Sequence, residues 1–169
     1  KVLEQLLSDA YWGDLDLLLL DLPPGTGDIA ISLGQLLPAS EIIVVTTPQI
    51  AAAEVSERAG RIAHQLKQHI IGIIENMSDS ACNKCGEPIA IFGTGGGLET
   101  AKHLSSLVGA DVALIGQIPF APALREGGDV GQPIVISDPT CPASEAFAAI
   151  VEKITLRPKS LVGVRLSVS

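Results

Sequence analysis

Two short segments contain the side chains best suited to chemistry. Cys82 and Cys85 form a Cys-x-x-Cys pair in the polar stretch SDSACNKCGEP, which Gly86 and Pro88 mark as a loop. Two thiolates at this spacing can bind one metal ion or two corners of a cluster. Zinc and [4Fe-4S] clusters both take four ligands, and Cys141 is the only other cysteine, so one chain supplies no obvious complete set. Two chains related by a twofold axis would supply four thiolates at a dimer interface.

Two other interpretations of this pair stay open. It is compatible with a thioredoxin-like redox pair, although no helix is expected to start at Cys82 and lower its thiol pKa, and with a loop holding two free thiols. Cys141 precedes Pro142 at a predicted helix start and is interpreted as structural. The histidines lie in or near predicted helices without ligand spacing to the pair: His64, His69 and His103.

The second segment is LLLLDLPPGTGD, residues 17–28. Its leucine run is apolar on both faces, which predicts a central strand of a parallel sheet over residues 17–21. Asp21 would then lie at the carboxyl end of that strand, where open α/β sheets bind ligands and a carboxylate can hold Mg²⁺ through a water. Pro23 and Pro24 exclude a helix there, whereas Gly25 and the second glycine let the backbone approach a charged group closely.

The same letters allow two further interpretations. One is an ordinary strand-to-helix turn in which Asp28 caps the next helix. The other is a dinucleotide fingerprint, because Gly25-x-Gly27 and Ala30 fit G-x-G-x-x-[GA] and Glu41 lies at a tolerable distance for a ribose carboxylate. The two prolines disturb the tight turn that this fingerprint needs.

Composition narrows the class of protein. The chain has 169 residues, 47% of them apolar, which is enough for one domain with a substantial core. A net charge of −8 and only 3% aromatic residues exclude the basic, base-stacking surface of a nucleic-acid-binding protein. No apolar run approaches 18 residues, so no membrane span is expected. With no visible signal peptide, the cytoplasm is the expected location.

Strands and helices alternate along the chain. Short β-branched runs predict strands at 41–47, 70–76 and 111–119, and helical periodicity predicts helices at 28–37, 97–108 and 142–154 and after Pro48. This order predicts an α/β fold with a doubly wound, mostly parallel sheet. Residues 1–156 are expected to form one domain, with 157–169 as a tail, and the glycine run 93–97 is expected to be a mobile hinge.

Several motifs in a fixed order resemble a known family. DLPPGTGD, VVTTPQ, GIIENMS, Cys-x-x-Cys, IFGTGGG and IGQIPF followed by LREGGDVGQP resemble the Mrp (ApbC) family of P-loop iron-sulfur cluster carriers, which are relatives of the MinD/ParA ATPases. The similarity runs from about Tyr11 to Ile154. It implies a P-loop NTPase-like fold in a cytoplasmic homodimer that binds and hydrolyses ATP with Mg²⁺ and transfers a [4Fe-4S] cluster to apo iron-sulfur proteins, with no nucleic-acid or membrane partner.

The resemblance also implies roles for individual residues. Asp21 would be the Walker B-type carboxylate for Mg²⁺. Asn76 would hydrogen-bond the adenine, although by itself it reads as a strand-end turn residue. Cys82 and Cys85 would bind the cluster between two subunits. The remaining nucleotide-binding residues would form the switch II loop that senses the γ-phosphate, or line the base pocket: Pro23, Gly25 and Thr26 for the loop, and Pro119 and Phe120 for the pocket.

One family feature is missing from these 169 residues. The deviant Walker A loop, Lys-Gly-Gly-x-Gly-Lys-[Ser/Thr], does not occur, and phosphoryl transfer depends on such positioning and charge. The chain is therefore expected to be the carboxyl-terminal portion of a longer ATPase and to be inactive in hydrolysis alone. A MinD/ParA-like nucleotide-switch scaffold and an NAD-binding oxidoreductase using Gly25-x-Gly27 remain the alternative functions.

Overall fold

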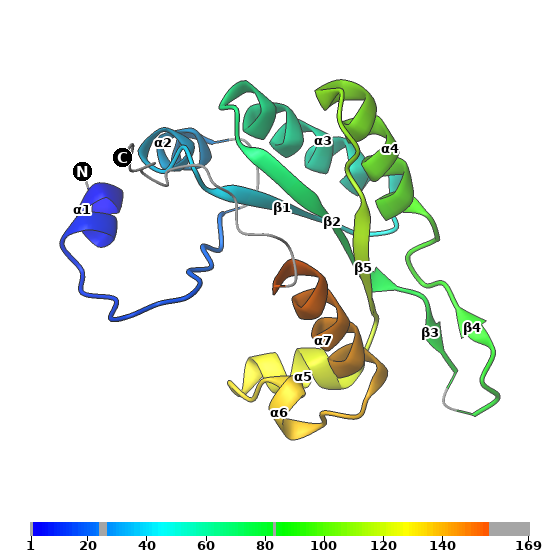
Figure 1. Ribbon diagram of the computed structural model, residues 1–169. Coiled ribbons are helices and arrows are strands. Elements are labelled where there is room, and N and C mark those ends of the chain that lie inside the picture. Colours follow the sequence, from blue (N-terminus) through cyan, green and yellow to red (C-terminus); the bar gives the residue numbers. More distant parts are fainter. Residues whose placement is uncertain (1, 24–26, 83, 156–169) are drawn as a thin grey trace, which may run out of the picture.

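The computed structural model describes residues 2–23, 27–82 and 84–155. Figure 1 shows the elements in chain order. The helices are α1 (Val2–Ser8), α2 (Asp28–Leu36), α3 (Ile50–Gln65), α4 (Gly96–Val108), α5 (Pro122–Asp129), α6 (Ile134–Ser137) and α7 (Pro142–Thr155). The strands are β1 (Glu41–Thr46), β2 (His69–Ser78), β3 (Ser80–Ala81), β4 (Pro88–Ile89) and β5 (Leu114–Pro119).

The central sheet is parallel and is covered on both faces. Its strand order is β1-β2-β5, with Val44 opposite Ile73 and Asn76 opposite Ile118. Helices α3 and α4 lie on one face of the sheet. Helix α7 lies on the other face, with α5 and α6 beyond it (Figure 1). Each crossover from one parallel strand to the next contains a helix, which is why helices must cover the sheet. The predicted α/β, doubly wound, mostly parallel architecture is confirmed.

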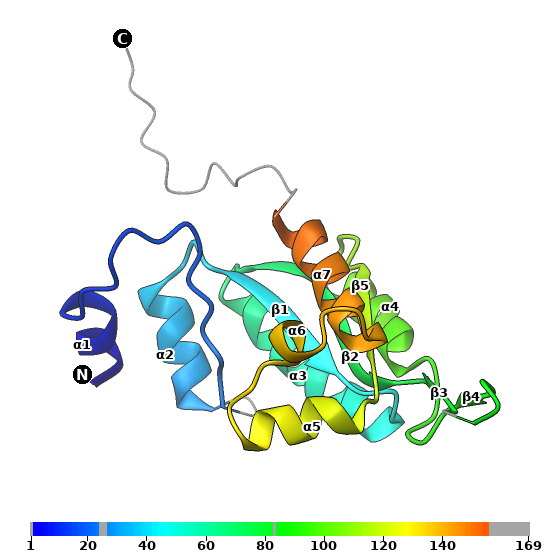
Figure 2. The ribbon, with the colours of Figure 1, turned by 90° about the horizontal axis from the view of Figure 1, so that it is seen from below.

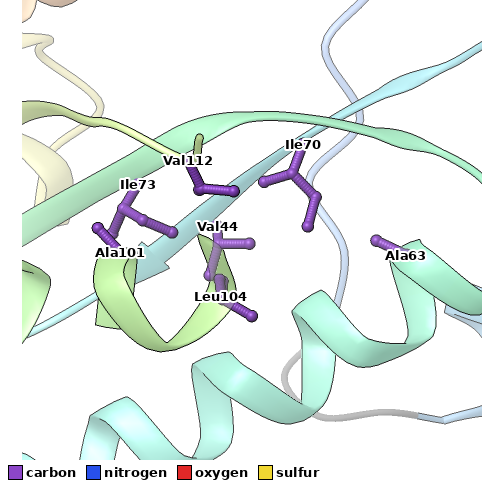
Figure 3. Packing of buried hydrophobic residues seen from close by; sticks show 7 residues of the cluster. All are labelled: Val44, Ala63, Ile70, Ile73, Ala101, Leu104 and Val112. Atoms are coloured by element: carbon purple, nitrogen blue, oxygen red, sulfur yellow. The ribbon is translucent and has the colours of Figure 1, made fainter. Parts of the chain in front are cut away.

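Two apolar clusters hold the layers together. On the α3 and α4 face, Ile73 and Leu104 are fully buried at the centre of a cluster drawn in Figure 3. On the other face, Ile118 of β5 packs with Ile150 of α7. The two clusters explain why the strands read as apolar on both faces in the sequence. No helix among the described residues is long and apolar enough to cross a membrane.

The strand predicted for residues 17–21 is wrong. These residues have no regular structure, and Leu17 and Leu19 are 57% and 74% exposed. In both Figure 1 and Figure 2 this blue segment passes outside the sheet, beside α2. A strand needs a hydrogen-bonded neighbour, and within the described ranges the sheet ends at β1, to which residues 17–21 do not pair. An apolar run alone therefore does not decide strand formation.

Other boundaries need smaller corrections. Strand β5 begins at Leu114, not at residue 111. Helices α5 and α6 and the short β3–β4 hairpin had not been predicted. Asp28 is the first residue of α2, whose N-cap is Gly27 without a side-chain cap, so the interpretation of Asp28 as the cap is wrong.

Candidate functional site

The carboxyl ends of the three parallel strands meet at one edge of the sheet. At this edge β2 pairs with β5, with Asn76 opposite Ile118 and Ser78 opposite Pro119. The Phe120 backbone N–H then donates to the Ser78 carbonyl at 3.1 Å. The structure thus brings together three of the residues predicted to bind adenine, Asn76, Pro119 and Phe120, on neighbouring strands. This edge is where open α/β sheets bind ligands.

Asn76 takes part in a local turn at this edge. Its Oδ1 accepts the backbone N–H of Met77 at 2.8 Å, and Met77 has a left-handed φ of 57°. This bond agrees with the interpretation of Asn76 as a strand-end turn residue. It uses one acceptor position of an amide that also carries two donors, so it does not exclude a contact with a base. The adenine role of Asn76 remains a prediction.

The two cysteines lie in a hairpin that projects from the same edge (Figures 1 and 2). Strands β3 and β4 pair antiparallel, and the Cys82 N–H donates to the Glu87 carbonyl at 2.8 Å. The Gly86 N–H, at a left-handed φ of 74°, donates back to the Cys82 carbonyl at 2.9 Å. Cys82 is half-buried and Cys85 is exposed. The prediction that both cysteines lie in a loop, with no helix starting at Cys82, is confirmed.

The hairpin favours the thiolate form of one sulfur. Hydrogen bonds to Cys82 Sγ from the Lys84 backbone N–H, the Cys85 backbone N–H and the Cys85 thiol lower the pKa of Cys82. Donors lower a thiol pKa because they stabilise the thiolate, which is the form that ligates metals. Within the described ranges no three His, Cys, Asp or Glu side chains group closely enough to hold a metal ion. The described part of one chain thus offers two closely spaced thiols, and their role as metal ligands remains a prediction.

An aromatic contact joins the segment that follows the cysteine hairpin to the predicted base pocket. Phe92 lies between β4 and α4, and its ring meets that of Phe120 edge to face, with centroids 5.8 Å apart and planes at 64°. This geometry is the favourable one for aromatic pairs. The sequence interpretation had not identified Phe92, because its partner is a residue that only the fold brings near.

Glu75 is a second residue that the sequence interpretation missed. Its side chain is 1% exposed and accepts hydrogen bonds from the Gly97 backbone N–H at 2.6 Å and from Gln117 Nε2 at 2.7 Å. These partners lie on α4 and β5, so one carboxylate joins three elements. The available signal was an acidic residue inside the apolar run of β2, where a charge is costly unless it is satisfied.

The glycine run before α4, predicted to be a mobile hinge, is divided between a loop and the first turn of the helix. Gly93 and Gly95 have left-handed φ values of 84° and 83°. Gly96 and Gly97, in contrast, are buried in the first turn of α4. The last two glycines are therefore fixed by packing.

The residues predicted to bind the phosphates and Mg²⁺ are placed differently. Asp21 and Pro23 are exposed in the irregular segment before α2, and no interaction found among the described residues joins them to the carboxyl edge. Gly25 and Thr26 lie outside the described residues. Among the described residues, the structure therefore does not bring Asp21 or Pro23 into the predicted site.

The position of Glu41 argues against its role as the ribose carboxylate of a dinucleotide site. Glu41 begins β1, at the amino end of the sheet, and its Oε1 lies 2.9 Å from His69 Nδ1. A ribose carboxylate belongs at the carboxyl edge, where ligands bind. The structure also holds two open hollows, of about 400 Å³ between α3 and α4 and about 290 Å³ between β5 and α7, and neither is lined by a predicted site residue.

Comparison with known structures first defines the class. This chain shares its parallel sheet, wound by helices on both faces, with the septum site-determining protein MinD complexed with Mg-ADP from Pyrococcus horikoshii OT3. The TM-score is 0.51, and the identity is 23% over 80% of this chain and 48% of that one. The nucleotide-binding protein in complex with ADP from Archaeoglobus fulgidus is more similar, at a TM-score of 0.65 and 36% identity over 78% of this chain and 51% of that one. The fold is that of the MinD-like P-loop NTPases.

The family follows from the sequence match. The model of the ParA family described as NUBPL iron-transfer P-loop NTPase matches residues 1–155, and the chain belongs to this family. The iron-sulfur cluster carrier protein of Mycobacterium leprae (strain TN) is 54% identical over 98% of this chain and 43% of its own length. The family resemblance expected from the motifs is confirmed. The chain spans somewhat less than half of that relative.

Proposed function

We propose that the intact protein is a cytoplasmic iron-sulfur cluster carrier that binds and hydrolyses ATP and delivers a [4Fe-4S] cluster to apoproteins. The observation that carries this proposal is the cysteine hairpin. It places an exposed and a half-buried thiol at the ligand-binding edge of a P-loop NTPase fold, and backbone donors lower the pKa of Cys82. The Mycobacterium leprae relative is named an iron-sulfur cluster carrier protein, which supports the carrier part of this proposal.

The cluster is cargo held between two copies of the chain. Each copy contributes Cys82 and Cys85, which gives the four thiolates that a [4Fe-4S] cluster takes. Exposure of Cys85 at the hairpin tip leaves room for a second copy. Delivery is a ligand exchange, in which thiolates of the recipient replace these sulfurs at iron without a net change in oxidation state. A homodimer with its cluster at a solvent-accessible interface is suited to that exchange.

The nucleotide binds along the carboxyl edge of the sheet. Asn76 pairs with the adenine, and Pro119 and Phe120 line the base pocket. Asp21 would hold Mg²⁺, since a carboxylate oxygen is a hard ligand of the kind that this ion takes, and Pro23, Gly25 and Thr26 would form the loop that senses the γ-phosphate. These 169 residues contain no G-x-x-x-x-G-K-[ST] loop, so hydrolysis is proposed for the intact protein.

Single cysteine variants test the cluster. Cys82→Ser and Cys85→Ser in the intact protein are expected to abolish iron and sulfide retention after anaerobic reconstitution, because each removes two of four ligands from the dimer. Cys141→Ser is the matched control, since this half-buried thiol lies at the start of α7 and not in the hairpin. Unchanged iron content in both hairpin variants would refute the cluster assignment and leave a MinD/ParA-like switch without a cluster.

The Asp21→Asn variant tests the magnesium role separately. It keeps the size of the side chain but removes its charge, so ATP hydrolysis should fall while iron retention stays unchanged. Normal turnover in this variant would remove the assignment of Asp21.

A further inference from the structure

Glu75 is an unusual residue for the interior of this fold. It is the only carboxylate among the buried residues of the part that the structure describes. None of the ion pairs within residues 2–23, 27–82 and 84–155 includes it. Burial of an unpaired carboxylate is costly unless hydrogen bonds replace its hydration. Two short hydrogen bonds to Glu75 replace that hydration, so these bonds fix where the carboxylate lies.

The partners of Glu75 show what it holds. The N-cap of α4 is Gly95, which has no side chain to cap the helix, and Glu75 accepts the Gly97 N–H of the first turn instead. A negative charge is favourable at this end of a helix. Its second oxygen accepts Nε2 of Gln117 in β5. Contact is close, because a Cβ on Gly97 would lie 2.8 Å from Cβ of Glu75.

Each of the three joined elements leads to a proposed functional residue. Asn76 follows Glu75 directly in β2. Gln117 stands two residues before Pro119 in β5. The first turn of α4 ends the segment that returns from the cysteine hairpin and carries Phe92, whose ring contacts Phe120. Glu75 thus lies between the strands that lead to the proposed base pocket and the start of the helix that follows the cysteine hairpin.

We propose that Glu75 is a positioning residue that couples adenine-nucleotide binding at the strand ends to the setting of the Cys82 and Cys85 hairpin. This inference rests on the proposed function. Movement of Asn76 or Pro119 on a base shifts β2 or β5, and the carboxylate passes the shift to the start of α4 through bonds of 2.6 and 2.7 Å. Removal of the carboxylate should leave both sites present but independent.

The test measures thiol reactivity, which needs no cluster. The intact apoprotein is reduced, treated with iodoacetamide with and without Mg-ADP, and mapped by mass spectrometry, with Cys141 as the internal reference thiol. In the unmodified protein Mg-ADP should change the ratio of Cys82 to Cys141 alkylation rates by at least about fivefold, the lower end of couplings between sites. An unchanged ratio would overturn the coupling.

Variants then isolate Glu75. In Glu75→Ala the nucleotide effect should fall below about twofold while the Kd for ADP stays within about threefold of the original, a separation that general destabilisation would not produce. Gln68→Ala is the matched control, because Gln68 is also buried, at 8% exposure, and bonds Ser40 Oγ at 2.6 Å just before β2 begins. This control should keep the full effect.

A second variant covers failure of Glu75→Ala to fold. Glu75→Gln keeps the shape of the side chain and one acceptor but removes the charge at the helix start. The effect of Mg-ADP on its Cys82-to-Cys141 alkylation ratio should therefore lie between the effects in the unmodified protein and in Glu75→Ala. A folded Glu75→Gln protein with the full effect would overturn the proposal. If the unmodified protein binds neither ADP nor iron, the proposed function itself fails. If it binds both and the Glu75 variants match it, only the coupling fails.

Discussion

Close packing at the start of α4 makes Gly96→Ala the most informative single substitution. Gly96 lies in the first turn of α4, directly against the turn between β1 and α3. A Cβ at this position would lie 2.5 Å from the Pro48 carbonyl oxygen, 2.7 Å from the Pro48 carbonyl carbon and 2.7 Å from the Thr47 carbonyl oxygen. All three are backbone atoms of a turn that links two packed elements, so none can rotate away.

Two opposing effects set the magnitude. Alanine is preferred over glycine within a helix by about 1 kcal/mol. Overpacking costs about 1–3 kcal/mol, and the immobile backbone of Thr47 and Pro48 favours the upper part of that range. We therefore expect Gly96→Ala to lower the free energy of unfolding by about 1–2 kcal/mol, a roughly 5–30-fold change in the folded-to-unfolded ratio.

Urea denaturation of the intact protein measures this difference through the transition midpoint at constant m-value. Gly128→Ala is the control, since Gly128 lies in α5 with no atom within 4 Å of an added Cβ, and it should stabilise the protein by up to about 1 kcal/mol. The reasoning is refuted if Gly96→Ala is as stable as the original protein while Gly128→Ala behaves as expected. In that case α4 does not begin against the β1–α3 turn.

Three further predictions follow from single contacts. The hydrogen bond that His103 Nδ1 donates to Glu57 Oε1 at 2.5 Å, together with the charge of that carboxylate, raises the pKa of His103. This pair therefore stabilises the fold below the ordinary histidine pKa of about 6.5 and loses its contribution as pH rises through the raised value, so Glu57→Gln should lower the urea midpoint in acid and not in alkali. Alkylation of Cys82 should follow thiolate formation with a midpoint below that of a free cysteine, about 8.5, because backbone donors lower its pKa. Leu104→Ala should cost about 2–5 kcal/mol in urea denaturation, since Leu104 is fully buried between α4, α3 and the sheet.

Each of these has an outcome that contradicts it. An equal loss of stability from Glu57→Gln at both pH values would mean that the ion pair does not form. A normal thiol midpoint at Cys82 would show that the Lys84 and Cys85 donors do not reach its sulfur. A cost below about 1 kcal/mol for Leu104→Ala would place that side chain outside the core.

Local patterns predicted most elements of this fold. Helices α3, α4 and α7 and strands β1 and β2 follow periodicities that a few neighbouring residues carry. The cysteine loop was also predictable, because Gly86 and Pro88 interrupt regular structure within the segment itself. Helix α5 was missed although Pro122 stands at its first turn, a common helix start, because Gly127 and Gly128 reduce the helical signal.

Features that depend on distant partners were not predictable in this way. The leucine run at 17–20 has the composition of a buried strand but no paired neighbour among the described residues. The contact of Phe92 with Phe120 was not predictable, because only the fold brings the two rings together. Glu75 looks like an isolated charge in β2 until Gly97 and Gln117, 22 and 42 residues further along the chain, supply its hydrogen bonds.

The sequence by itself determined the fold class, the family and the closely spaced pair of cysteines, because these depend on residue types and on spacings of a few positions. The tertiary structure alone decided which predicted residues meet. It brought Asn76, Pro119 and Phe120 to one edge, set Phe92 against Phe120 and Glu75 against the start of α4, and left Asp21 exposed outside regular structure. The physical reason is that hydrogen bonds and packing join residues by distance in space, and parallel strands bring together positions that are far apart along the chain.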